Sequence, residues 1–405
     1  QYFFARAIGA AWVLSNESFL KDVENVDFLK LKASYGHLGY AGNTGFFLYR
    51  TNWKKGDKEE FRPTIGGNTT DLSRWGNPDL KWEYSNELNV GIEGLFFDNR
   101  LSTEINYFRE LRKNIIGVNN AKYAATGGDF IPYENIGEVM NQGFDAYVNW
   151  NDKIGKDFIY NVGFNVTYTK NELRKSNELS NIEEYRKAIG RPTSTIFGWQ
   201  AEGLFGKDIP LEGHPNQTFG NYQIGDIAYA DLNGDGIVDN NDQKSIGQSF
   251  PTTTMGIDVT LKYKGIGLYI LGTVTTGITK LCTSSYYWNS GLNGYSVLAS
   301  DRYHPVNNPE GTQPRLTTMA ADNNQRNSTF WTENGSFFRL KNIELSYTLA
   351  NKSGKGIGKN YKFFLRGTNL FVLSGIKDLD PERILSGVTN YPTYRTVTGG
   401  LSISF

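Results

Sequence analysis

The sequence is poor in the residues that build disulfide frameworks and zinc clusters. Among 405 residues there are one cysteine and three histidines, and a lone cysteine excludes an internal disulfide and any cysteine-based zinc cluster. No stretch approaches the roughly 18 consecutive apolar residues that a membrane helix needs. The 42 basic and 42 acidic residues cancel, whereas a nucleic-acid-binding protein should carry a basic excess. We therefore expect neither a membrane helix nor a nucleic-acid partner.

Glycine and aromatic residues, by contrast, are abundant. The chain holds 45 glycines, and 14% of its residues are aromatic, against a usual glycine content of about 7%. The mean hydropathy of −0.47 is that of a soluble protein. A transmembrane β-barrel, however, alternates polar and apolar residues and also averages to a hydrophilic value. The averages therefore leave both classes open.

The dominant periodicity is two, which indicates β-strands. In residues 87–97, for example, Leu88, Val90 and Ile92 share one face, with Asn89 on the other. Asp98-Asn99 then joins this run to the next as a two-residue hairpin turn. The pattern predicts eleven strands, at 3–13, 26–36, 87–97, 101–108, 144–150, 158–169, 254–264, 266–278, 337–349, 360–371 and 395–405.

A soluble β-sandwich also alternates, so strand length and connections must decide between the two folds. Several runs reach 11 to 14 residues, longer than the usual 5–6 or so of globular strands. Aromatic residues gather near strand ends, as in a membrane-interface girdle. Short and long connections also alternate, which is typical of outer-membrane barrels. The short ones are 98–99, 151–156, 264–265 and 350–359, and the long ones are 37–80, 117–142, 171–253, 279–336 and 372–394.

We therefore predict an all-β fold, a transmembrane antiparallel β-barrel with long extracellular loops. Residues 1–405 form one β-barrel domain, and 171–253 form one long extracellular loop. The odd strand count, the missing start methionine and the missing signal peptide indicate a fragment that lacks its N-terminal part. The last strand ends on Phe405, and a terminal aromatic residue resembles the C-terminal signal of outer-membrane barrels.

A set of short segments runs in order over nearly the whole chain and is specific when taken together. The segments are NPDLKWE at 77–83, NIGEVMNQG at 135–143, GSFFRLKN at 335–342, LSY at 345–347, RGTNLF at 366–371, DLDPE at 378–382 and YPTYR at 391–395. Together they resemble the SusC/RagA-like TonB-dependent outer-membrane transporters of Bacteroidetes.

This resemblance implies a location in the bacterial outer membrane and a particular machinery. The fold would be the C-terminal half or so of a 22-stranded plugged barrel, with the plug in the missing N-terminal part. A SusD-like surface lipoprotein would cap the outer mouth, and the TonB-ExbB-ExbD system would drive import through the plug. The substrate would be an oligosaccharide or a peptide. Such a barrel binds its substrate and controls its passage, and it is not an enzyme. The sequence also shows no hydrolase or metalloprotease motif.

Residues 231–242 have the spacing of an EF-hand calcium loop. Oxygen ligands in this pattern suit a hard cation, and Gly236 supplies the sharp turn. The alternative is a metal-free turn rich in Asp, Asn and Gly. A bound Ca²⁺ would fix a loop of about eighty residues, which we expect to have little core of its own. The predicted ligands are Asp231, Asn233, Asp235, Ile237 (through its carbonyl), Asp239 and Asp242.

Aromatic residues in the predicted loops are candidates for substrate or lid contact. We select the cluster of Tyr286, Tyr287 and Trp288. Aromatic residues are candidates for ligand contact because their flat faces can stack on sugar rings. The same residues equally fill protein interfaces or pack loops together. Two other functions stay open from the residues alone: a calcium-stiffened receptor or adhesin, and a passive porin without active uptake.

Overall fold

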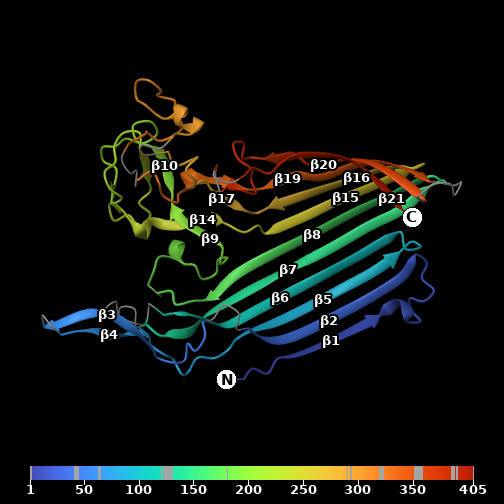
Figure 1. Ribbon diagram of the computed structural model, residues 1–405, viewed down its shortest axis with the longest axis horizontal. Coiled ribbons are helices and arrows are strands. Elements are labelled where there is room, and N and C mark those ends of the chain that lie inside the picture. Colours follow the sequence, from blue (N-terminus) through green and yellow to red (C-terminus); the bar gives the residue numbers. More distant parts are fainter. Residues whose placement is uncertain are drawn as a thin grey trace.

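One antiparallel sheet of eleven strands is the main element of the fold (Figure 1). Its strands pair in chain order without a crossover. The computed structural model describes residues 2–40, 45–62, 65–119, 122, 131–179, 181–289, 291, 294–318, 323–350, 359–384, 388 and 391–404, with backbone alone at 58–62, 65 and 66. The strands are β1 (Arg6–Val13), β2 (Val26–Tyr40), β5 (Glu83–Phe96), β6 (Leu101–Val118), β7 (Tyr133–Ile154), β8 (Phe158–Lys175), β15 (Thr253–Tyr263), β16 (Ile266–Thr276), β19 (Phe337–Ala350), β20 (Asn360–Ser374) and β21 (Thr396–Ser404).

All eleven predicted strands are confirmed, but several are longer than predicted. The strand β7 has 22 residues, and β6 and β8 have 18 each. The pairing of β6 with β7 continues past a register shift between Arg112 and Ile115. A bulge of this kind breaks the alternation in sequence while the backbone stays extended. Phe405, at the end of the last predicted strand, lies outside the described residues.

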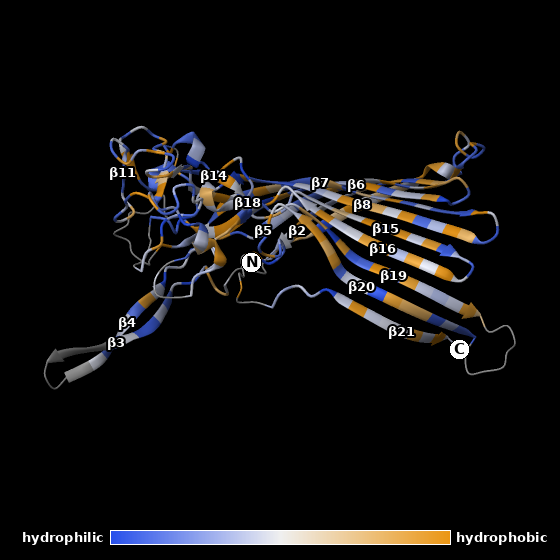
Figure 2. Ribbon diagram, turned by 90° about the horizontal axis from the view of Figure 1, so that it is seen from above, coloured by the Kyte–Doolittle hydropathy of each residue, from blue (hydrophilic) through white to orange (hydrophobic). Residues whose placement is uncertain are grey.

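The two faces of the sheet differ in chemistry, as the alternation predicts. One face exposes apolar side chains such as Val90, Ile105 and Leu365, and the alternation is visible as stripes along the strands (Figure 2). The opposite face carries cross-strand ion pairs, including Lys30–Glu93 and Lys32–Glu104. Charge on a lipid-facing wall costs about 2–4 kcal/mol at mid-membrane. We therefore assign the charged face to the lumen and the apolar face to lipid.

Tight turns join the strands at one end of the sheet and long connections leave from the other (Figure 1). The β5–β6 turn places Asp98 and Asn99 at φ 57° and 59°, the left-handed conformation that a type I′ hairpin requires. The β15–β16 turn uses Lys264 and Gly265 at φ 44° and 88°. The predicted alternation of short and long connections is therefore present in the described chain, although parts of 117–142 and 350–359 lie outside it.

The long connections carry their own short elements. One is a projecting hairpin of β3 (Asn52–Arg62) and β4 (Ile65–Arg74). No helix in the described part of the chain is long and apolar enough to cross a membrane. The other elements are β9 (Thr195–Trp199), β10 (Ala201–Leu204), β11 (Asn216–Gln217), β12 (Ile227–Tyr229), β13 (Ile237–Val238), β14 (Gln243–Gln248), β17 (Thr279–Leu281), β18 (Thr332–Asn334) and the 3₁₀ helices η1 (Leu14–Asn16), η3 (Glu184–Arg186), η4 (Asn240–Asp242), η5 (Val297–Asp301) and η6 (Thr329–Trp331).

Candidate functional site

The connections β8–β15 and β16–β19 fold together into one unit, which we call the loop body (described residues of 176–252 and 277–336). Its core joins Trp199, Phe219 and Tyr229 from the first connection to Tyr303 and Trp331 from the second. The rings of Trp199 and Phe219 meet edge to face with centroids 4.9 Å apart. The expectation that the first loop has little core is therefore wrong. The sequence pattern does not reveal this core, because two of its eight buried residues, Tyr303 and Trp331, come from the second connection.

Buried polar groups in the loop body are paired across the same two connections. Asn324 Nδ2 donates to Asp226 Oδ1 at 2.8 Å, and the Asn324 side-chain oxygen accepts from the Ile227 N–H at 2.9 Å. Arg315 Nε lies 2.8 Å from Asp226. Gln217 Nε2 donates to Asn323 Oδ1 at 2.6 Å. Because an unpaired buried polar group costs roughly 1–3 kcal/mol, these pairs fix how the two connections meet.

The calcium-type loop lies on this body, between β12 and β14. Asp231 accepts the Gly234 and Gly236 N–H groups at 2.7 and 2.8 Å. Gly236, at φ 84°, makes the predicted sharp turn. Asp242 is fully buried, and its two oxygens accept the N–H groups of Leu232 and Asp239, each at 2.8 Å. The loop is thus closed on itself by its own carboxylates.

The remaining predicted ligands complete this closed turn. Asp235 Oδ1 accepts the Ile237 N–H at 2.8 Å, and Asn233 Oδ1 accepts the Asp235 N–H at 3.0 Å. Asp239 accepts the Asn241 N–H at 2.6 Å. Within the described ranges, no group of three or more His, Cys, Asp or Glu side chains gathers as a metal site would. The types of side chain and the turn thus match a calcium loop. The carboxylates, however, accept hydrogen bonds from backbone N–H groups of the same loop.

The loop is tied directly to the aromatic core. Trp199 Nε1 donates to the Asp239 carbonyl at 2.8 Å. The Tyr185 hydroxyl donates to the Asn241 carbonyl at 3.0 Å, and Arg186 donates to the Asn241 side chain at 2.7 Å. A change in the shape of loop 231–242 would therefore reach the core through the Asp239 carbonyl and through Val238, whose side chain is part of that core.

The predicted aromatic cluster packs inside the loops. Tyr287 and Trp288 pack against the core of the loop body, and Tyr287 also contacts a second small core that contains Cys282. Burial raises the pKa of the Tyr287 hydroxyl and that of the Cys282 thiol, the latter to about 11. Cys282 is thus a neutral thiol at pH 7, which is inert as a nucleophile. Substrate contact by Tyr286, Tyr287 and Trp288 stays a prediction.

Two segments of the family resemblance meet in space, which the sequence alone did not reveal. Arg339 on β19 donates to Asp380 Oδ1 at 2.7 Å, and its Nε lies 2.8 Å from Glu382. Lys341 lies 3.2 Å from Glu382. The Arg339 side chain is only 3% exposed. We call the eleven-stranded sheet the wall. Arg339, Lys341, Asp380 and Glu382 hold the β20–β21 connection against it, and we call these four residues the clasp.

The clasped connection also packs on the loop body. Ile376 and Ile384 bury their side chains against Cys282, with Leu379 and Tyr287 beside them. Burial alone would raise the pKa of Asp380, but hydrogen bonds from Arg339 and from the Glu382 N–H outweigh it and lower that pKa. Three long connections therefore form one assembly at this end of the sheet.

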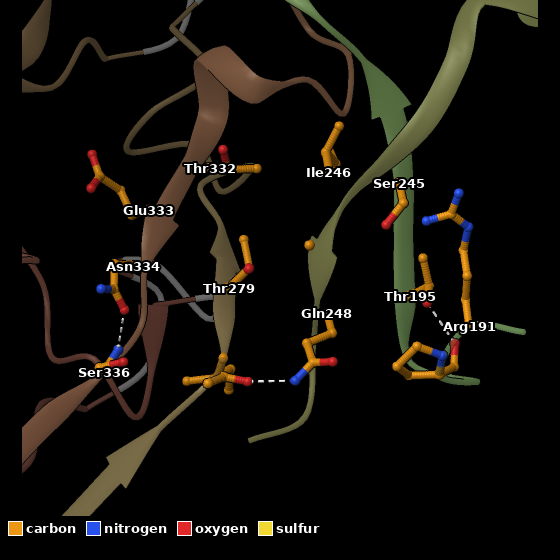
Figure 3. Close-up of a pocket in the computed structure, with 14 residues that line it drawn as sticks. Arg191, Thr195, Ser245, Ile246, Gln248, Thr279, Thr332, Glu333, Asn334 and Ser336 are labelled. Atoms are coloured by element: carbon orange, nitrogen blue, oxygen red, sulfur yellow. Dashed lines mark hydrogen bonds between the residues drawn. The ribbon is translucent and has the colours of Figure 1, made fainter. Parts of the chain in front are cut away.

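A cavity of about 650 Å³ lies where the loop body meets the strand ends (Figure 3). Hydroxyl and amide side chains from four short strands line it, including Thr195 of β9, Ser245 of β14, Thr279 of β17 and Asn334 of β18. Gln248 Nε2 donates to the Gly277 carbonyl at 2.6 Å, across two connections. No aromatic residue lines the cavity among the described residues, so the predicted aromatic cluster lies elsewhere.

Comparison with known proteins decides the family. Residues 7–370 match the family described as TonB dependent receptor-like, beta-barrel. The chain belongs to this family. It is therefore an outer-membrane β-barrel protein of a receptor and transporter family, and the predicted fold class, location and family are confirmed. The family is one of receptors and transporters and not of enzymes, as the sequence indicated.

Individual relatives agree. The chain is 28% identical to TonB-dependent receptor P26 of Formosa agariphila over 100% of its own length and 42% of that protein. It is 24% identical to TonB-dependent receptor SusC of Bacteroides thetaiotaomicron, over 98% and 40%. A chain of the RagAB peptide transporter shares the fold, with a TM-score of 0.75 and 22% identity over 99% of this chain and 43% of that one. The chain thus spans less than half the length of these relatives.

Proposed function

We propose that the protein imports oligosaccharides or peptides across the outer membrane in a TonB-dependent manner. The observation that carries the proposal is the family match over 7–370 on a wall with an apolar outer face and a charged inner face. Such a wall surrounds a polar passage. The chain's own residues bind and gate there, and no bond is made or broken.

The partners we propose follow from the same relationship. A SusD-like surface lipoprotein would dock at the long-loop end, where the loop body and the clasped connection present one continuous structure. The TonB-ExbB-ExbD system would supply the driving force through a plug in the full-length protein. The similar RagAB structures are those of a peptide transporter, which supports a peptide. The family resemblance of the sequence motifs supports an oligosaccharide as readily.

Uptake measured in cells tests this function and separates it from the two alternatives. Cells that carry the gene should accumulate a labelled oligosaccharide or peptide, and deletion of the gene or of tonB should each abolish accumulation. A passive porin would keep uptake without tonB. A calcium-stiffened receptor or adhesin would bind ligand at the surface with no uptake in any strain. Either result would refute active import.

We further propose that loop 231–242 holds a structural Ca²⁺. The donor set supports this, because Asp231, Asn233, Asp235 and Asp239 offer the oxygen ligands that Ca²⁺ prefers, and the Ile237 carbonyl adds another. Asp242 is shorter than the usual final glutamate, and its oxygens are bonded to backbone N–H groups. When bound, the ion would neutralise the clustered carboxylates and stiffen the loop.

Protease sensitivity with and without a chelator tests the calcium proposal. We expect the double substitution Asp231→Ala and Asp235→Ala to speed cleavage within 200–250 while the wall stays folded. A chelator should produce the same effect in the parent protein and none in the variant. Glu212→Ala, an exposed residue outside the calcium-type loop, serves as the matched control. Equal cleavage of variant and parent under both conditions would refute the proposal.

A further inference from the structure

A small aromatic cavity lies at the opposite side of the long-loop end from the loop body, between the end of β2 and the start of β5. Its volume is about 310 Å³. The aromatic residues Tyr40, Phe47, Tyr49 and Trp82 are among the residues that line it, and so is Lys81. We call this cavity and its lining the aromatic cup.

The phenyl rings at the rim of the cup are exposed to solvent. Phe46 is 88% exposed and Phe47 59% exposed, although both are apolar. Their backbone is nonetheless fixed, because Arg74 Nη2 donates to the Phe46 and Phe47 carbonyls at 3.3 and 2.9 Å. The Arg50 N–H also donates to the Phe47 carbonyl at 2.9 Å. The ring positions are thus set before any ligand arrives.

The backbone at Phe47 is strained. Its φ is 58°, a left-handed conformation that a bulky residue rarely adopts and that costs of order 1–3 kcal/mol. Burial of the ring does not repay this cost, because the ring faces solvent. Hydrogen bonds to the Phe47 carbonyl hold this conformation, and backbone strain that is held beside an exposed ring is typical of a contact with a ligand.

The floor of the cup is rigid. The Arg112 guanidinium lies 4.1 Å from the centre of the Tyr40 ring, and Arg112 also pairs with Glu83 at 2.6 Å. The other Glu83 oxygen accepts the Ile116 N–H at 2.9 Å. The carboxylate nearest the cup is therefore already neutralised and is unable to repel an anion.

The cationic groups of the cup, by contrast, are available. Both backbone groups of Lys81 are bonded to the Asn135 side chain, at 2.8 and 2.9 Å. No described residue accepts a hydrogen bond from Lys81 Nζ or from the Arg50 guanidinium, which lies over the Phe47 and Tyr49 rings at 5.6 and 5.5 Å. The described lining of the cup thus combines aromatic rings with one cation, Lys81, and with one carboxylate that is already paired, Glu83. Arg50 adds a second cation beside two of the rings.

We propose that the aromatic cup binds an anionic saccharide. The C–H faces of the sugar ring would stack on Phe47 and Tyr49, and its carboxylate or sulfate group would pair with Lys81, with Arg50 adding charge. The exposed rings, the Lys81 ammonium group without a described acceptor and the nearby Arg50 guanidinium together favour such a ligand over a neutral sugar. The proposal rests on the import function proposed above and names the substrate class for it.

Binding by the purified full-length protein in detergent tests the cup separately from transport. The probes are a uronate tetrasaccharide, a sulfated tetrasaccharide, a neutral tetrasaccharide and tetra-alanine, each titrated by calorimetry. We expect at least one anionic sugar to bind more tightly than the neutral sugar and the peptide. Phe47→Ala or Tyr49→Ala should weaken that binding about 2- to 10-fold, as expected for loss of one aromatic contact, whereas Phe47→Tyr should retain it.

Charge substitution and a control complete the design. Lys81→Gln should weaken binding of the anionic sugar and leave the neutral sugar unchanged. Phe250→Ala removes an equally exposed loop aromatic on another connection and should have no effect. Preference for the neutral sugar or the peptide, or binding unaffected by Phe47→Ala and Tyr49→Ala, would overturn the proposal. Intact binding with no uptake would refute import alone, whereas uptake without cup-dependent binding would refute the cup alone.

Discussion

The clasp gives the most direct prediction of stability. Arg339→Ala removes the partner of two carboxylates, of which Asp380 has 18% and Glu382 36% of its side chain exposed. Breaking a buried ion pair by removing one partner costs about 3–5 kcal/mol, whereas exposed pairs contribute about 0–1 kcal/mol. We assign about 3 kcal/mol to the Arg339–Asp380 pair, at the low end because Asp380 is not fully buried. Opening of the connection 375–384 should become roughly 100-fold more favourable.

Amide hydrogen exchange followed by mass spectrometry measures this opening. Peptides from 375–384 should exchange about 100-fold faster in Arg339→Ala, while peptides from the wall strands keep the parental rate. Lys341→Ala is the matched control, since it removes a partner of the same Glu382 from the same strand at an exposed site. It should change the rate less than about 5-fold. Equal exchange in the two variants, or faster exchange spread over the wall, would refute the clasp as a local anchor.

Three further predictions concern pH, the core and the wall. The pKa of Asp380 is lowered below 3.8 in the folded protein. The clasp is therefore fully stabilising above that pH and weakens as the pH falls through the lowered pKa of Asp380. Amide exchange of 375–384, corrected for its intrinsic rate, should stay constant from pH 8 to 5 and increase below about pH 4. Trp199→Ala should destabilise the loop body by about 3–5 kcal/mol. Trp199→Phe loses the hydrogen bond to Asp239 and part of the ring but keeps an aromatic side chain in the core, so it should destabilise the loop body less. The rate of cleavage in both connections measures each effect, and equal effects would contradict the packing described. Leu345→Lys on the apolar face should lower the free energy of unfolding by about 2–4 kcal/mol in a bilayer refolding assay. Asn342→Lys on the charged face should lower it much less. The reverse order would show that the two faces of the sheet were assigned the wrong way round.

The wall could be predicted from the sequence because its information is local. Alternation marks each strand by residues two apart, and the turns at Asp98-Asn99 and Lys264-Gly265 lie directly between their strands. The errors occurred where alternation breaks, as at the bulge near Arg112, beyond which β6 and β7 stay paired. The end predicted for the strand at 101–108 was therefore too early, because β6 continues to Val118.

The candidate site could be predicted only in part, because its contacts join distant residues. The turn of loop 231–242 follows from its own spacing, and the structure shows it. The pairing of Arg339 with Asp380 spans 41 residues, and the Ala201 N–H donates to the Thr329 hydroxyl across 128. The strain at Phe47 depends on Arg74. No local pattern encodes such pairs.

The shared core of the loop body sets an order of events during biogenesis. Trp199 and Phe219 are synthesised long before Trp331, yet they bury their rings only together with it. Contacts of such high sequence separation form late, because the intervening chain must first be closed into a loop. Until β19 has paired with β16, the first connection therefore presents bare aromatic surface. A chain that ends before residue 331 would expose an aggregation-prone aromatic surface. Chaperone capture or proteolysis would therefore act before the second connection has folded onto the first.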